Sequence, residues 1–247
     1  PRVLLHRERL DNIVGEEWQY AILRGTEYNT GDGLNMAFDV GAEPYGDWSM
    51  GHAIGTDANA PKVGDFTKPG DIFKKHSYPL GIMVNNEGNR FVDEGADFRN
   101  YTYAKYGREI LKQPGLIAYQ IFDQQVRPLL RNEYNLDEAT CFQANTLEEL
   151  VEQLDVNKTK FLNTIKEYNK AVQDGNYDPS VKDGKGTNGI FPPKSNWALK
   201  IEKGPFYAFP ITCGITFCFG GVKANSRAEV LTKAEQPIKG LYAAGEM

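Results

Sequence analysis

The order of its segments limits the fold of this chain more than any single motif. Two apolar runs around a turn at 80–94 and two helical patterns at 146–154 and 161–172 lie between stretches rich in glycine. A hairpin and a helical pair between such flanks predict an α+β fold. We expect a compact α+β domain over residues 53–205, set into parts of another domain at 1–52 and 206–247.

Local patterns inside the central region predict its elements. Gly81–Val84 and Arg90–Asp93 alternate like the two strands of a hairpin, with Asn85–Asn89 as the turn. Ala118–Phe122 reads as a further buried strand. Thr146 and Glu149 have the spacing of a capping box that opens a short helix.

The flanks carry weaker signals. Asp32 is expected to be the N-cap of a helix that Gly41 ends, and Gly175 to end the helix over 161–172. Residues 42–75 are rich in Gly, Asp and Pro and predict a long loop region. Beyond residue 205 the strand-like runs are 206–214, 221–223, 228–231 and 241–244.

Composition excludes several classes of protein. The 247 residues carry a net charge of −5 with scattered basic residues, which disfavours nucleic acid as a partner. The sequence lacks an apolar run of the roughly 18 residues that a membrane span needs, and its start lacks the pattern of a signal peptide. Three cysteines without CxxC spacing, none beside a histidine, favour a reducing, cytoplasmic location and no metal site.

Several segments together resemble a known family. LGIMVNNEGNRFVDE at 80–94, followed by Arg99, is similar to a hairpin of the fumarate reductase/succinate dehydrogenase flavoproteins. The last residues, GLYAAGEM, and TFCFGGV at 216–222 resemble two further motifs of that family. HSYPLGIMVN, PPKSNWA and ITCGITF look most like its tricarballylate dehydrogenase branch.

The resemblance implies an FAD-dependent oxidoreductase that transfers a hydride between flavin and a di- or tricarboxylate. It implies a capping domain at 53–205 and segments of a Rossmann-like FAD-binding domain at 1–52 and 206–247. A cradle for the FAD pyrophosphate needs a glycine turn that follows a strand and opens a helix, and Gly31-Asp32-Gly33 is too short to be one. We therefore expect a fragment that does not hold FAD by itself.

Arg99 matches the family's arginine that acts as proton acid/base. Arginine barely releases its proton in water, so this role requires a strongly basic carbon and a relay that returns the proton. Where the family's relay has a glutamate and an arginine, this sequence has Lys74, Lys75, His76 and Ser77. The relay is rebuilt from lysine, or the proton path differs. The alternative is a structural arginine paired with Glu94 or Asp97, in an acidic cluster with Asp93 that otherwise reads as a solvated edge.

His52 falls where the family binds a substrate carboxylate, and otherwise it is a packed or solvated residue. A second such histidine of the fumarate reductases is replaced by Thr216-Phe217, and phenylalanine donates no hydrogen bond to a carboxylate. Thr216 or Thr212 is expected to contribute a hydroxyl instead. This replacement disfavours a fumarate site of the usual kind.

The resemblance assigns FAD contacts to Gly220, Gly221 and Glu246; without it, the glycines read as a bulge or turn and Glu246 as a solvated charge. A small carboxylic acid is the expected substrate, with an electron-transfer protein as a possible partner. The alternatives are a fumarate reductase-like or 3-ketosteroid dehydrogenase-like flavoprotein, and a non-catalytic module that binds acidic ligands.

Overall fold

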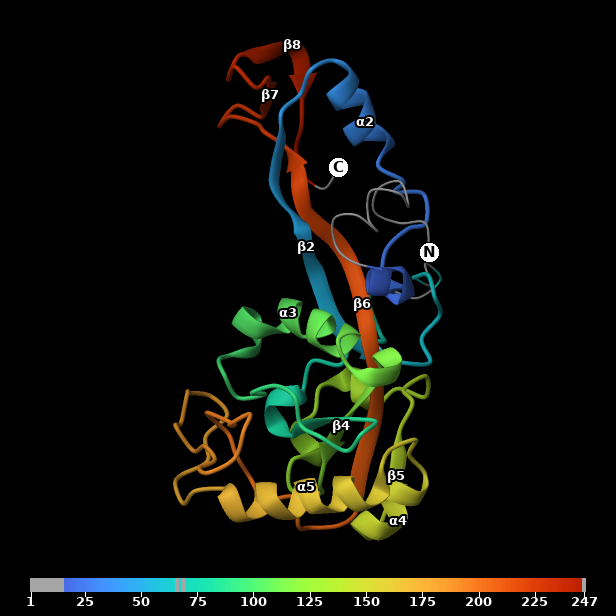
Figure 1. The fold of residues 1–247 in the computed structure, drawn as a ribbon, viewed down its shortest axis with the longest axis vertical. Helices are drawn as coiled ribbons and strands as arrows, with labels where there is room; N and C mark the ends of the chain where they lie inside the picture. Colours follow the sequence, from blue (N-terminus) through green and yellow to red (C-terminus); the bar gives the residue numbers. More distant parts are fainter. Residues whose placement is uncertain (1–15, 65–66, 68–69, 246–247) are drawn as a thin grey trace. The chain divides into compact units, whose positions relative to one another are not determined.

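The fold comes from a computed structural model that describes residues 16–64, 67 and 70–245 (Figure 1). These residues form two compact units. Unit 1 holds residues 16–53, 61–64 and 215–245, and unit 2 holds residues 54–60, 67 and 70–214. That residues 53–205 form a capping domain, with 1–52 and 206–247 in a flavin domain, stays a prediction.

Unit 2 is built on an antiparallel sheet. Strand β4 (Ala118–Phe122) lies between β3 (Ile82–Asn85) and β6 (Phe206–Val222), and β5 (Phe142–Ala144) also pairs with β6. The register places Ile82 opposite Ile121, and Ala118 opposite Ile211. The helices of the unit are α3 (Arg99–Leu111), α4 (Leu147–Glu152) and α5 (Lys158–Ala171), with the short 3-10 helices Tyr78–Leu80, Pro114–Leu116, Arg127–Leu129 and Asn132–Tyr134.

Alternating side chains of β3 and β4 divide the core of unit 2 between two faces of its sheet. Ile82 and Val84 pack with the buried face of α5, whereas Met83 packs with Tyr106 and Ile110 of α3. Because neighbouring strand residues point to opposite faces, α5 and α3 cover opposite sides of the sheet. Two packed faces hold the first turn of α3 in place, and that turn carries Arg99.

The described part of unit 1 has an α-helix that packs in a small core of its own. Helix α2 (Asp32–Asp39) packs Ala37 and Phe38 against the hairpin of β7 (Glu229–Leu231) and β8 (Pro237–Tyr242). The remaining elements are the 3-10 helix Glu16–Tyr20, β1 (Ile22–Leu23), which pairs with β6, and the parts of β2 (Pro44–Asp57) and β6 in this unit.

The local predictions for β4 and for the capping box of α4 are confirmed. Ala118–Phe122 is a fully buried strand, and the Thr146 hydroxyl accepts from the Glu149 N–H while the Glu149 side chain accepts from Thr146 N–H. Gly41 follows α2 in a left-handed conformation, with φ of 92°, as expected of a residue that ends a helix. The mixed α and β composition with an antiparallel sheet agrees with the predicted α+β class.

The predicted loop over 42–75 is wrong in its first half. Strand β2 spans Pro44–Asp57 and pairs with β6, although its glycines hide any alternating pattern. Gly46 shows why glycine is needed there: its φ is 89°, and a Cβ atom would lie 2.2 Å from the Phe219 carbonyl oxygen. Glycine in a strand thus marks a close approach of two backbones.

Three smaller expectations also differ from the structure. Asp32 is the first residue of α2, and the N-cap position belongs to Gly31, whose φ is 81°. Arg90–Asp93 does not form a strand but a single bridge, from Arg90 to Val84, because the next N–H of β3, that of Met83, donates to the Glu94 side chain instead. Helix α5 ends at Ala171, because the backbone of Val172 is no longer helical; Gly175 therefore does not end the helix.

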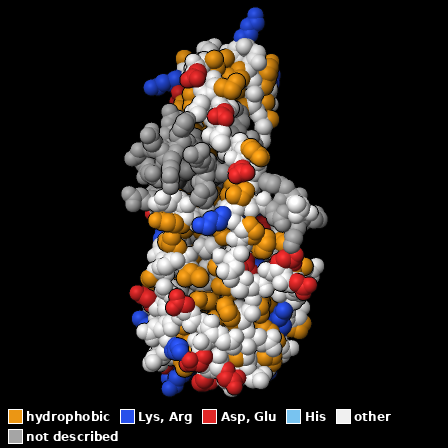
Figure 2. All heavy atoms as spheres, turned by 90° about the vertical axis from the view of Figure 1, so that its right-hand side faces the viewer, with side chains coloured by type: hydrophobic (Ala, Val, Ile, Leu, Met, Phe, Trp, Pro, Cys, Tyr) orange, Lys and Arg blue, Asp and Glu red, His pale blue; other side chains and the backbone are white. Residues whose placement is uncertain are grey.

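One face of the molecule shows charges of both signs. Figure 2 shows a face on which acidic and basic side chains are interspersed rather than gathered by sign. Among the described residues, every helix is too short or too polar to cross a bilayer. Within the same residues, no cluster of three His, Cys, Asp or Glu side chains has the arrangement of a metal site.

Candidate active site

Arg99 is the first residue of α3, in unit 2. Its guanidinium lies over the Tyr103 ring, 5.3 Å from the ring centre, and Nη1 is 3.4 Å from Nδ1 of His76. Nη2 donates to the side chain of the neighbouring Asn100. Helix α3 begins here because Phe98 has extended backbone, and the helix is anchored by its buried residues two turns later.

Arg99 does not pair with Glu94 or Asp97, as the alternative interpretation expected. Glu94 is fully buried and pairs with Arg90 at 2.5 Å, and Asp97 pairs with Lys182 at 3.4 Å. The acidic cluster is therefore not a solvated edge. Asp93 accepts hydrogen bonds from the backbone and hydroxyl of Ser195. Neither of the two expected carboxylates pairs with Arg99, so its charge is available to a ligand.

A cavity of about 240 Å³ opens beside Arg99, entirely within unit 2. Its lining, as far as the structure describes the chain, holds two guanidinium groups and an imidazole but no carboxylate. Cationic and hydrogen-bonding groups over apolar walls suit a small anion. The cavity is lined by His76, Ser77, Pro79, Leu80, Phe98, Arg99, Leu129, Arg131, Pro179 and Trp197.

Arg131 is a cavity residue that the sequence did not reveal. Its backbone N–H donates to the hydroxyl of Ser77 at 3.1 Å, and the Ser77 N–H donates to the Tyr134 hydroxyl at 2.8 Å. Its Nε donates to Glu133 at 3.0 Å. These contacts join segments that are 54 residues apart in the chain, so no local motif could have identified Arg131.

A buried polar network lies beneath the cavity. The Lys75 ammonium is 3.3 Å from an Asp57 carboxylate oxygen, and both side chains are almost completely buried. Burial lowers the pKa of Lys75, although Asp57 opposes the shift. The Tyr134 hydroxyl donates to Gln120, whose amide donates to the Lys75 carbonyl at 2.9 Å. Of the residues expected near the relay, His76 is the one whose side chain contacts Arg99.

A second cluster of predicted residues lies in unit 1. His52 Nδ1 is 3.3 Å from the Thr216 hydroxyl, which accepts from Arg24 Nη1 at 2.7 Å. The Phe217 ring stacks on His52, with ring centres 4.9 Å apart. Burial and the nearby Arg24 charge lower the pKa of His52, so its imidazole is neutral at pH 7. The structure thus joins His52 to Thr216 and adds Arg24, a residue the sequence analysis did not select.

The other predicted site residues have separate surroundings. Thr212 lies in unit 2, and its hydroxyl donates to the Leu116 carbonyl at 2.8 Å. A Cβ on Gly220 would lie 2.3 Å from the Trp48 indole, so that indole explains this glycine. A Cβ on Gly221 would have no atom within 4 Å, which leaves open space there. Glu246 lies outside the described residues.

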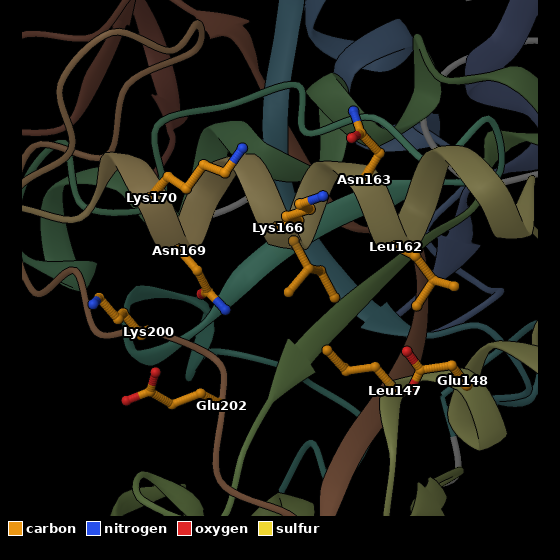
Figure 3. Close-up of a pocket in the computed structure, with 10 residues that line it drawn as sticks. Leu147, Glu148, Leu162, Asn163, Lys166, Asn169, Lys170, Lys200 and Glu202 are labelled. Carbon is orange, nitrogen blue, oxygen red and sulfur yellow. The ribbon is translucent and has the colours of Figure 1, made fainter.

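A wider depression of about 650 Å³ runs along α5 (Figure 3). In the close-up, Asn169 points from α5 toward the segment that carries Glu202, and its amide bonds the backbone of Ile201 at both ends. Lysines and glutamates both line this depression, including Lys166 and Glu148. It therefore has no preference for one sign of ligand charge, unlike the cavity beside Arg99.

Comparison with known protein families shows to which family the chain belongs. The family described as "FAD binding domain" matches residues 2–247. The chain belongs to this family. It lies within the fumarate reductase/succinate dehydrogenase flavoprotein superfamily, as the resemblance of its motifs implied; the tricarballylate branch stays a prediction.

Individual relatives agree with this assignment. The chain is 33% identical over 227 residues to the NADH:acrylate oxidoreductase of Vibrio harveyi, covering 88% of this chain and 20% of that protein. It is 30% identical to the 3-oxosteroid 1-dehydrogenase of Mycolicibacterium smegmatis, covering 90% of this chain and 41% of that protein. An open flavocytochrome c3 fumarate reductase structure has a TM-score of 0.66 at 28% identity, covering 97% of this chain and 38% of the other.

The chain thus spans less than half the length of these relatives. The matched proteins are flavin-dependent oxidoreductases that act on CH–CH bonds. Substrates named among them include a small carboxylate and a steroid, so family membership leaves the substrate class open.

Proposed function

We propose that this chain is part of an FAD-dependent oxidoreductase that reduces or forms a carbon–carbon double bond next to an acidic or carbonyl group. The observation that carries the proposal is Arg99, which pairs with neither Glu94 nor Asp97, on a cavity whose described lining has cationic groups and no carboxylate. Resemblance, family membership and this local electrostatic setting all favour the same chemistry.

The described residues of unit 1 fit a family that binds FAD. Trp48 Nε1 is buried without a hydrogen-bond partner among the described atoms, and Gly221 has open space beside it. Tyr28, Tyr45 and Phe219 are exposed apolar side chains of the kind that a further group covers. We propose that Gly221 and Glu246 contact FAD. The space beside Gly220 is occupied by the Trp48 indole.

When bound, FAD supplies the hydride chemistry. In our proposal, the Arg99 guanidinium gives a proton to the substrate carbon in the reductive direction and takes it back in the oxidative one. A group with a pKa above about 12 does this only for a strongly basic carbon. His76, whose Nδ1 lies 3.4 Å from Nη1, is the group we propose to restore the proton.

The finer assignment, to a tricarballylate-like substrate, is the second candidate. Phe217 stacks on His52, and the Thr216 hydroxyl lies within hydrogen-bond distance of His52 Nδ1. A site in which Thr216 replaces a second histidine favours a substrate other than fumarate. The fumarate reductase-like and ketosteroid dehydrogenase-like alternatives rest on the relatives described above.

The test uses the complete gene product that contains this chain. We expect it to bind FAD and to show a flavin absorption spectrum. Anaerobic reaction with tricarballylate, succinate and a 3-ketosteroid, followed by flavin absorbance, separates the candidate substrates. Arg99→Gln is expected to slow the reaction about 100-fold or more, the usual loss for a proton-transfer group, while FAD remains bound. A colourless protein that takes up no FAD would contradict the proposal and leave the non-catalytic binding module.

A further inference from the structure

The cavity beside Arg99 holds more positive charge than a single proton donor requires. Arg99 and Arg131 both line it, together with His76 and Ser77. Among the described residues, the Glu133 carboxylate pairs with Nε of Arg131. One carboxylate against two guanidinium groups leaves positive charge for a ligand to neutralise.

Arg131 has the donors to bind that ligand. Only its Nε has a hydrogen-bond partner among the described residues, and 46% of its side chain is exposed. Nη1 and Nη2 are the ends of the planar fork that suits a carboxylate. The Ser77 hydroxyl fixes the Arg131 backbone, and Glu133 fixes its Nε, so the fork is held in orientation before a ligand arrives.

The walls and the size of the cavity restrict the rest of the ligand. Leu80, Leu129 and Trp197 give apolar surface for a short carbon chain. Its volume of about 240 Å³ lies below the roughly 300–1,000 Å³ of pockets that enclose drug-sized molecules. A small aliphatic acid fits this space better than a fused ring system does.

We propose that Arg131 is a specificity-determining residue that binds a carboxylate remote from the reacting carbons, and that the substrate is a small aliphatic di- or tricarboxylate. This inference rests on the proposed function, because the other end of the acid lies at Arg99. A monocarboxylate bound at Arg99 leaves the Arg131 fork empty, and a ketosteroid has no carboxylate to pair with it. Arg131 thereby narrows the substrate classes that family membership leaves open.

Binding tests the inference without turnover. Calorimetry on the complete FAD-containing protein, with succinate, tricarballylate and propionate as probes, is expected to show the first two binding at least about tenfold more tightly than propionate. Arg131→Gln is expected to remove that advantage and leave propionate binding unchanged. Arg131→Lys, which keeps the charge but loses the fork, should retain part of it.

The matched control is Lys158→Gln. Lys158 is also a half-exposed cation of unit 2 with one carboxylate partner, Glu152, and it does not line the cavity. Its substitution is expected to leave all three affinities unchanged. Unchanged succinate affinity in Arg131→Gln, or equal affinity for succinate and propionate in the wild type, would overturn the inference.

The outcome is separable from that of the proposed function. If acids bind in an Arg131-dependent manner but never exchange electrons with the flavin, the subsite stands and the proposed reaction fails. If the flavin reacts with an acid while Arg131→Gln binds it normally, the reaction stands and the subsite fails. Far-ultraviolet circular dichroism of each variant identifies loss of folding, in which case Arg131→Lys carries the test.

Discussion

Two arginines of unit 2, nine positions apart in the sequence, have opposite surroundings. Arg90 is 8% exposed and uses every nitrogen of its guanidinium: Nε and Nη2 bond Glu94, and Nη1 donates to the Pro192 carbonyl at 2.7 Å. Arg99 is half-buried at a cavity, with His76, Asn100 and the Tyr103 ring as its neighbours.

The difference separates a charge that holds the fold from one that serves a ligand. Around Arg90, burial lowers the pKa and the Glu94 carboxylate more than reverses the effect, so the pKa is raised and the charge is locked in. Arg90 also ties the segment at 192–193 to the β3 turn region. Within the part of the chain that the structure describes, Arg99 has no carboxylate partner, which suits a residue that meets an acid.

The largest effect is expected from breaking the Arg90 ion pair. In Glu94→Ala, the buried guanidinium loses its carboxylate, and the Met83 N–H loses the acceptor that lies 2.7 Å away. Removing one partner of a buried pair costs about 3–5 kcal/mol of the free energy of unfolding. Chemical denaturation followed by circular dichroism measures the loss.

The control for this prediction is an exposed pair of the same unit. In Glu152→Ala, the lost partner is Lys158, and both side chains are at least half exposed. Exposed pairs contribute at most about 1 kcal/mol. If Glu94→Ala destabilised no more than Glu152→Ala, the distinction between a locked and an available arginine would lose its basis.

The predictable parts of the fold are those fixed by neighbours in sequence. Ala118–Phe122 and the Thr146 capping box needed only local patterns. Strand β2 was missed because its glycines carry no alternating side chains, and pairing with the distant β6 stabilises it. The predicted return strand likewise stops at Arg90, because the Glu94 side chain accepts from the Met83 N–H that a longer strand would have bonded.

The candidate site follows the same rule. His52 and Thr216 were selected through resemblance to family motifs, and the structure does bring them together. Arg24 and Arg131 were missed because their partners lie far along the chain, 192 and 54 residues away. From the sequence alone it was open whether Arg99 pairs with Glu94. The structure answers this, because the buried Glu94 pairs with Arg90.

A second effect sharpens the comparison on the structural side. Lys194 is fully buried, and its ammonium donates to the carbonyls of Pro79, at 2.7 Å, and Gly81. Burial lowers its pKa to about 8 from 10.5. A lowered lysine pKa means that the folded state binds fewer protons than the unfolded state between these two values, so stability rises with pH across that window.

The expected gain is about 3 kcal/mol between pH 8 and pH 10.5, and little of it appears below pH 8, where both states are protonated. The measurement is the difference in unfolding free energy between wild type and Lys194→Met at a series of pH values, since titration of the tyrosines affects both proteins. A difference that stays constant from pH 7 to pH 10.5 would contradict the prediction.

The smallest effect is expected at Arg99 itself. Arg99→Gln removes a cation above the Tyr103 ring, at 5.3 Å, and the contact with His76, but it leaves no buried carboxylate without a partner. Cation–π contacts at such partly exposed sites contribute about 0.5–1 kcal/mol, so the unfolding free energy should fall by no more than about 1 kcal/mol. Arg90→Gln makes the same chemical change at the locked site and should cost several times as much, because the buried Glu94 then has no cation beside it. Equal losses in the two variants, measured in one denaturation series, would mean that Arg99 is as structural as Arg90 and has no charge to offer an acid.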